Sequence, residues 1–62
     1  MSNAQYVVVN SNGEYFVKMN EQLKIIFTKN IEEAAKMDNY EAKNLIPIIA
    51  FRTGLTCVLE QV

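Results

Sequence analysis

The sequence contains no histidine and no tryptophan, a single cysteine, and two glycines that lie far apart. Without histidine, the usual general base and the commonest metal ligand are both missing. One cysteine permits neither an intrachain disulfide nor a cysteine-based zinc site, and isolated glycines do not form a phosphate-binding loop. The composition therefore argues against most common catalytic and metal-binding arrangements, and we expect a protein that is not an enzyme and holds no cofactor.

Neither sign of charge is in clear excess. Six lysine and arginine residues are interleaved along the chain with seven acidic residues, which gives a net charge of −1. Proteins that bind nucleic acids usually gather their cations on one face to neutralise phosphates. We therefore do not expect nucleic acid to be the partner.

Long apolar runs are also missing. The longest, Leu45–Phe51, is interrupted by Pro47 and falls far short of the roughly 20 residues that span a bilayer. The beginning of the chain lacks the basic start and long apolar stretch of a signal peptide. A lone thiol is typical of a reducing compartment, so the sequence predicts a cytoplasmic protein without a membrane segment.

The chain has 62 residues, half of them hydrophobic. A domain of this size buries only about 60% of the surface that its unfolded chain exposes, and no disulfide adds stability here. The high apolar content therefore indicates a surface for self-association or for a protein partner, with a homodimer as one outcome. Ser2-Asn3-Ala4 resembles an expression-tag remnant, so we treat residues 1–4 as a tag remnant or a disordered N-terminus, and residues 5–62 as a single domain.

A β-hairpin is the clearest local feature. Its strands, Tyr6–Val9 and Tyr15–Val17, are rich in β-branched and aromatic residues, and Asn12-Gly13 between them is a strong hairpin-turn signal. A two-residue turn would pair Val9 with Phe16, whereas a three-residue loop with a glycine bulge would pair Val9 with Tyr15 and Val7 with Val17. Both registers leave large apolar residues on both faces, which suits a central place in a sheet or a second face covered by another subunit.

The rest of the chain predicts a third strand over Leu23–Thr28, two helices and a closing strand over Leu55–Val62. The first helix begins after Asn30, and the second begins near Asn39 after the cap Asp38 and ends at Gly54. Pro47 either kinks this second helix or splits it after Asn44; the unbroken apolar spacing favours a kink. The predicted fold is α+β, in the order β-β-β-α-α-β. Its antiparallel meander carries the helices on one face, and the last strand returns beside the first.

Candidate reactive groups have simpler structural roles. Cys57 lies in an apolar strand with no neighbouring base, so we expect it to be buried. The densest carboxylates fall at the starts of the two predicted helices, where capping and the helix dipole account for them better than metal binding or catalysis does; these residues are Glu32, Glu33, Asp38 and Glu41.

The run Thr28–Met37 and the following Asp38–Ala42 fit a pattern in which a hairpin leads to "T..I.EA..F…EA" and a closing strand. In this pattern the sequence resembles small uncharacterised proteins of Gram-positive bacteria and their phages. Methionine replaces the usual aromatic residue at position 37, and Pro47 is atypical. The resemblance implies a phage or prophage accessory context and supplies no catalytic residue.

Two functional hypotheses follow. The first is a non-enzymatic accessory protein that acts by binding another protein through the outer face of the hairpin or the Ile48/Phe51 surface. Its candidate contact residues are Tyr6, Val8, Phe16, Lys18, Ile48 and Phe51. The alternative is a nucleic-acid-binding module in which bases stack on an aromatic sheet face made of Tyr6, Tyr15 and Phe16, with Lys18 and Lys24 beside it.

Replacing Gly13 by valine tests the hairpin. The turn requires a positive φ at Gly13, which costs a β-branched residue about 1–2 kcal/mol. The variant should therefore have a lower melting temperature in thermal unfolding followed by circular dichroism. An unchanged melting temperature would rule out the hairpin assignment.

Overall fold

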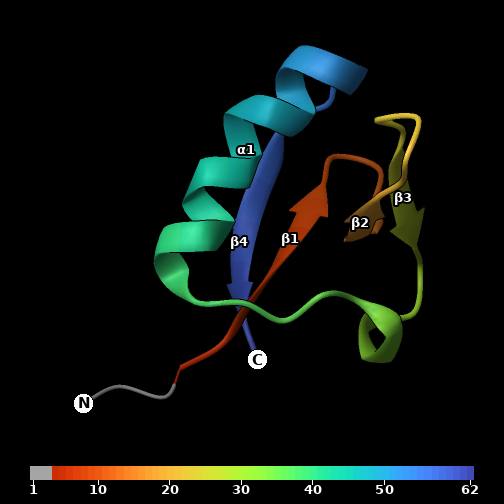
Figure 1. Ribbon diagram of the computed structural model, residues 1–62. Helices are drawn as coiled ribbons and strands as arrows, with labels where there is room; N and C mark the ends of the chain where they lie inside the picture. Colours follow the sequence, from red (N-terminus) through yellow and green to blue (C-terminus); the bar gives the residue numbers. More distant parts are fainter. Residues whose placement is uncertain (1–3) are drawn as a thin grey trace.

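The computed structural model describes residues 4–62, which form a four-stranded antiparallel sheet with one long helix on one face (Figure 1). The elements follow the chain as β1 (Tyr6–Asn10), β2 (Tyr15–Met19), β3 (Ile25–Thr28), the 3-10 turn η1 (Ile31–Glu33), α1 (Asn39–Thr53) and β4 (Cys57–Gln61). The strand order is β3-β2-β1-β4, so the last strand lies beside the first, as predicted. The α+β class and the meander are confirmed. Of residues 1–4, which were predicted to be a tag remnant or disordered, only Ala4 falls within the described range.

The prediction of two helices is wrong. Asn30 does cap a helical segment, and its Oδ1 accepts a hydrogen bond from the Glu32 N–H at 3.0 Å. The segment is only the single 3-10 turn η1, and Ala34 returns to an extended backbone at φ −70° and ψ 148°. The apolar spacing of Ile31, Ala34 and Ala35 suits a helix locally, but the backbone after Ala34 is used by the sheet instead.

Residues 35–37 form a wedge between β1 and β2. The Ala35 N–H donates to the Phe16 carbonyl at 3.0 Å, on the β2 side. On the β1 side, Met37 and Tyr6 exchange two backbone hydrogen bonds, at 2.7 and 3.0 Å. These bonds occupy backbone groups that a regular β1–β2 ladder would need. The two strands therefore separate away from their shared loop.

The hairpin has the three-residue loop and not the two-residue turn. Val9 pairs with Tyr15, the Asn10 N–H donates to the Glu14 carbonyl at 2.8 Å, and Gly13 has φ 78°. The pairing expected for Val7 with Val17 in this register does not follow, because residues 35–37 form the next hydrogen bonds along both strands.

The loop between β2 and β3 repeats the geometry of the first loop ten residues later. Asn10 and Asn20 each accept two backbone N–H bonds at Oδ1, from the residues two and four positions on, at 2.8–3.0 Å. In each loop the asparagine carbonyl also accepts an N–H three residues later, from Gly13 in the first and Leu23 in the second. Leu23 therefore occupies the place of Gly13, with φ 63°. The third strand begins after this loop, at Ile25, and not at Leu23 as predicted.

Helix α1 runs without a break through Pro47, so the alternative in which it stops near Asn44 is wrong. Its start is confirmed: the Asp38 carboxylate accepts the Glu41 N–H at 2.8 Å. Its end is confirmed as well, since Gly54 adopts the left-handed conformation at φ 76° and its N–H donates to the Ala50 carbonyl. Both ends of the helix are therefore fixed by residues whose chemistry suits a cap.

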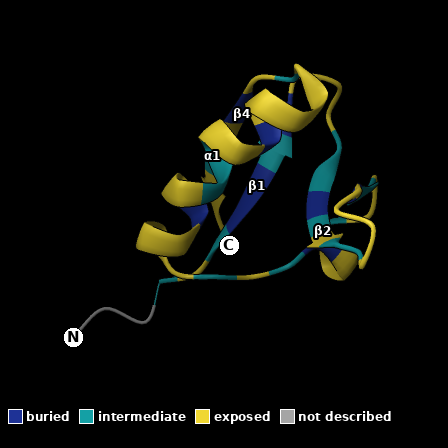
Figure 2. Cartoon of the chain, turned by 45° about the horizontal axis from the view of Figure 1, so that its top comes forward, coloured by how far each residue is buried: buried dark blue, intermediate teal, exposed yellow. Residues whose placement is uncertain are grey.

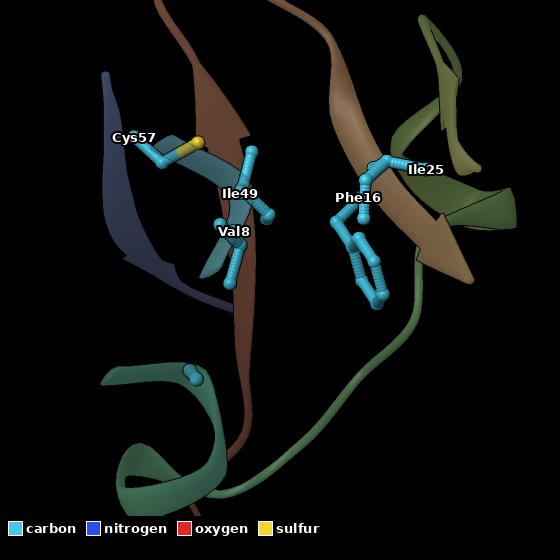
Figure 3. Packing of buried hydrophobic residues seen from close by; sticks show 6 residues of the cluster. Val8, Phe16, Ile25, Ile49 and Cys57 are labelled. Atoms are coloured by element: carbon cyan, nitrogen blue, oxygen red, sulfur yellow. The ribbon is translucent and has the colours of Figure 1, made fainter. Parts of the chain in front are cut away.

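The core lies between α1 and one face of the sheet. Figure 3 shows Val8, Ile49 and Cys57 together, with Phe16 and Ile25 on the β2–β3 side. Ala42 of α1 completes this buried cluster. Helix α1 packs mainly on β1 and β4, so the central strand β1 has α1 on one face.

The opposite face of the sheet is also apolar. Residues that alternate with the core positions point to this side, and their burial falls from complete at Val7, through partial at Val9, Tyr15 and Ile26, to largely exposed at Val58. The prediction that both faces carry apolar residues is confirmed.

Replacing Leu23 by glycine should stabilise the protein. A non-glycine residue in the left-handed region costs about 1–2 kcal/mol, which glycine avoids. Glycine loses more conformational entropy on folding, and this loss offsets part of the stabilisation. We expect a net increase of about 0.5–1 kcal/mol in the free energy of unfolding, measured by urea denaturation. A decrease would show that the half-exposed Leu23 side chain makes contacts worth more than the backbone strain.

Candidate functional site

Helix α1 is apolar on two opposite faces. Ala42 and Ile49 are fully buried against the sheet. On the far side, Phe51 is 90% exposed and Tyr40 is 76% exposed, and Pro47 is exposed between them. Figure 2 shows this outer side of α1 as exposed along its length. Exposed aromatic side chains gathered on one helix face are typical of an interaction surface.

A groove lies beside this face, between α1, β2 and residues 35–37. We call it the α1–β2 groove, and its volume is about 520 Å³. Its lining comprises Phe16, Val17, Lys18, Ala35, Lys36, Met37, Glu41, Asn44, Leu45 and Ile48. Because the wedge of residues 35–37 separates β2 from β1, the side chains of β2 do not close against α1 here. The groove is therefore a consequence of the wedge.

The charged side chains that line the groove are divided by sign between its two walls. Lys18 of β2 and Lys36 of the wedge lie on the sheet side, and Glu41 of α1 lies on the helix side. The Lys36 ammonium is 3.4–3.5 Å from the carbonyl oxygens of residues 31, 32 and 34, which hold it at the end of η1. Two cations thus face one anion across an apolar lining.

A smaller hollow of about 290 Å³ lies at the N-terminal end of α1. It is lined by Ala4, Tyr6, Asp38, Asn39 and Tyr40. Tyr6 is half-buried here, and Asp38 is already engaged as the helix cap. The hollow is an extension of the exposed face of α1 towards the start of β1.

The predicted contact residues do not form one surface. Phe16, Lys18 and Ile48 meet in the α1–β2 groove, Tyr6 lines the smaller hollow, and Phe51 stands on the outer face of α1.

Two of these assignments need correction. Val8 is fully buried beneath α1, because its side chain points to the core face of the sheet, and it is not a surface residue. Phe16 is also in the core, with 7% of its surface exposed, and contributes only to the lining of the groove.

Sequence reasoning missed Tyr40, Asn44 and Met37. The first two belong to a series, Tyr40, Asn44, Pro47 and Phe51, whose spacing of four, three and four residues indicates one stripe along a helix. That signal was present in the sequence. Met37 lines the groove only because residues 35–37 pair with the strands, and no local pattern predicts this pairing.

The aromatic residues proposed for base stacking are not on one platform. Phe16 is buried and Tyr6 packs against the core cluster, both on the α1 side of the sheet. Tyr15 alternates with Phe16 and lies on the other face. Stacking of successive bases needs several exposed rings on a single surface, so this arrangement does not favour the nucleic-acid alternative.

Two of the titratable side chains, those of Cys57 and Asp38, have structural roles. Cys57 is buried as predicted, and burial raises the pKa of its thiol above the ordinary value of 9.0. Asp38 caps α1 through its carboxylate. Within residues 4–62, no three histidine, cysteine or acidic side chains are grouped in a way that could hold a metal ion.

Across the same described part of the chain, no helix has the length and apolar character needed to cross a membrane. Comparison with known protein families, curated proteins and solved structures found no match to the chain.

The thiol of Cys57 should react slowly in the folded protein. Alkylation requires the thiolate, and a buried thiol with a raised pKa supplies little of it at pH 8. We expect iodoacetamide to modify the native protein at least about tenfold more slowly than the urea-unfolded chain. Because the Cys57 thiol has a higher pKa in the folded protein, the thiol of the unfolded chain ionises first. The free energy of unfolding should therefore fall as the pH rises past about 9. Equal alkylation rates would show that Cys57 is accessible.

Proposed function

We propose that the protein is a non-enzymatic interaction module that binds an apolar segment of another protein in the α1–β2 groove. This is the role expected of a small phage-type accessory protein in the cytoplasm. The observation that carries the proposal is the groove itself: an open, largely apolar depression that the chain maintains although its buried core is small. Such a depression leaves apolar surface in water, which costs stability that a bound partner would recover.

The lining defines the chemistry of the partner. Met37, Leu45 and Ile48 offer apolar contacts from the wedge and from α1. Lys18 and Lys36 give the sheet side a positive charge, although the whole chain has a net charge of −1. A bound segment with one or two apolar anchors and an acidic side chain directed towards these lysines would complement both features.

The groove brings together two exposed residues that were predicted to contact a partner. Lys18 and Ile48 are 30 positions apart in the chain, and they line the same depression from opposite sides. A peptide lying in the groove would contact both. Contacts with Phe51 and Tyr40 on the outer face of α1 are not required for this function.

A displayed library of random 12-residue peptides tests the proposal. We expect the selected peptides to share apolar residues and at least one aspartate or glutamate. For a selected peptide, Ile48→Asp and Lys18→Glu should each weaken binding about tenfold, equal to about 1.4 kcal/mol, in isothermal titration calorimetry. Lys29→Glu makes the same charge change outside the groove at an exposed position, and this control should bind as tightly as the unmodified protein.

Three results would overturn the proposal. The first is the absence of an enriched motif, and the second is peptide binding that Ile48→Asp and Lys18→Glu leave unchanged. The third is tight binding of a fluorescent 20-nucleotide single-stranded DNA with a steep salt dependence, which would favour the nucleic-acid alternative.

A further inference from the structure

We propose that the outer face of α1 is the interface of a symmetric homodimer in which the helices of two copies pack antiparallel. The contact residues are Tyr40, Asn44, Pro47 and Phe51, which we call the outer stripe. The outer stripe adjoins the α1–β2 groove and shares Asn44 with it. The inference does not depend on the proposed function.

The outer stripe has the spacing of a helix–helix seam. Its residues follow one another at intervals of four, three and four, which is the spacing of the a and d positions of a heptad. All four are exposed, and they lie opposite Ala42 and Ile49, which anchor α1 to its own sheet. The side of α1 that would meet a second helix is therefore free in the single chain.

The stripe is complementary to itself in one antiparallel register. When Tyr40 of one copy lies opposite Phe51 of the other, Asn44 lies opposite Pro47, and the two-fold axis then generates the remaining two layers. A two-fold interface requires such reciprocity: if Tyr40 contacts Phe51 of the other copy, Phe51 must contact Tyr40 of that copy. The aromatic residues then meet at both ends of the seam, and the smaller residues meet in its middle.

Charge complementarity selects the antiparallel orientation. Glu41 lies in the first turn of α1 and Arg52 lies in the last turn, both on the same flank of the outer stripe. In the single chain, the Arg52 guanidinium lies 3.5 Å from the Leu23 carbonyl oxygen. In the antiparallel register it can turn to Glu41 of the other copy, and the two helix dipoles then attract each other. A parallel pair would instead place the Glu41 and Arg52 flanks of the two copies on opposite sides of the seam and would align the dipoles.

Pro47 and Asn44 supply a specific polar contact at the centre. Pro47 has no N–H, so the carbonyl of Lys43, four residues earlier, receives no regular helical hydrogen bond. Asn44 of the second copy lies against Pro47 in the proposed register, within the same layer. Its side-chain amide can donate to the Lys43 carbonyl, which would otherwise need water. The proline that is unusual inside a helix thereby acquires a role in recognition.

The area is sufficient for a small specific interface. Aromatic side chains bury roughly 150–250 Å² each, and Tyr40 and Phe51 are mostly exposed, so the two supply on the order of 300 Å² per copy. Asn44, Pro47, Ile48 and the stem of Lys43 bring the total to on the order of 500 Å² per copy. A specific interface needs about 1,000 Å² in total, which the seam reaches.

Sedimentation velocity over a concentration range, together with charge-altering variants, tests the dimer. We expect a concentration-dependent monomer–dimer equilibrium. Phe51→Asp should raise the dimer dissociation constant at least about 30-fold, because it removes an aromatic anchor from both ends of the seam. Because Phe51 is 90% exposed, circular dichroism of this variant should show an intact fold. Val62→Asp adds the same charge at another exposed apolar position, outside the seam, and should dimerise normally.

A charge exchange tests the orientation separately. Glu41→Arg and Arg52→Glu should each weaken dimerisation about tenfold, and the double variant should recover to within about threefold of the unmodified protein. A chain that remains monomeric up to about 1 mM would overturn the proposal. So would a dimer that Phe51→Asp leaves intact, because its interface would lie elsewhere. A double variant no better than the singles would contradict the antiparallel register.

Discussion

The structure depends on the backbone hydrogen bonds that residues 35–37 make with two strands at once. Met37 bonds to Tyr6 of β1, and Ala35 bonds to Phe16 of β2. These bonds convert a potential helix into a wedge and hold β1 and β2 apart (Figure 1). They also set where α1 begins, because Asp38 follows Met37 directly and caps the helix. The α1–β2 groove, its lining and the position of α1 over β1 all follow from this one segment.

Signals carried by a few neighbouring residues predicted the structure well. The Asn-Gly pair predicted the hairpin, Asp38 predicted the start of α1, and Gly54 predicted its end. Each of these residues satisfies local backbone groups or allows a particular φ. The predicted return of the last strand beside β1 followed from the free edge that a three-stranded meander leaves.

Features that depend on distant parts of the chain were not predictable in the same way. The short helix expected after Asn30 has the correct cap and apolar spacing, yet its backbone pairs with strands that lie up to 31 residues away. The left-handed Leu23 was missed for a related reason. Leucine gives no local signal for that conformation, which the Asn20 side chain and the two flanking strands impose. The prediction that Val8 is a surface contact was wrong because the strand register decides which face of the sheet a side chain occupies.

The two apolar faces of α1 connect the small size of the domain to its proposed interactions. One face closes a compact core in which Ile49 and Val8 are fully buried. The other face carries Tyr40 and Phe51 into solvent, and the groove beside it exposes further apolar side chains. A chain of 62 residues has little stability to spare for exposed apolar surface. Association through these surfaces gives the sequence a physical reason to retain them.

Amide hydrogen exchange followed by nuclear magnetic resonance tests the wedge most directly. The account predicts that the amides of Ala35, Met37 and Tyr6 exchange as slowly as the paired amides of β1 and β4, because each donates to a strand or wedge carbonyl. If the Ala35 and Met37 amides instead exchange as fast as the amide of Ser11 in the exposed loop, residues 35–37 do not separate the strands. The groove and the functions assigned to it would then have no structural basis.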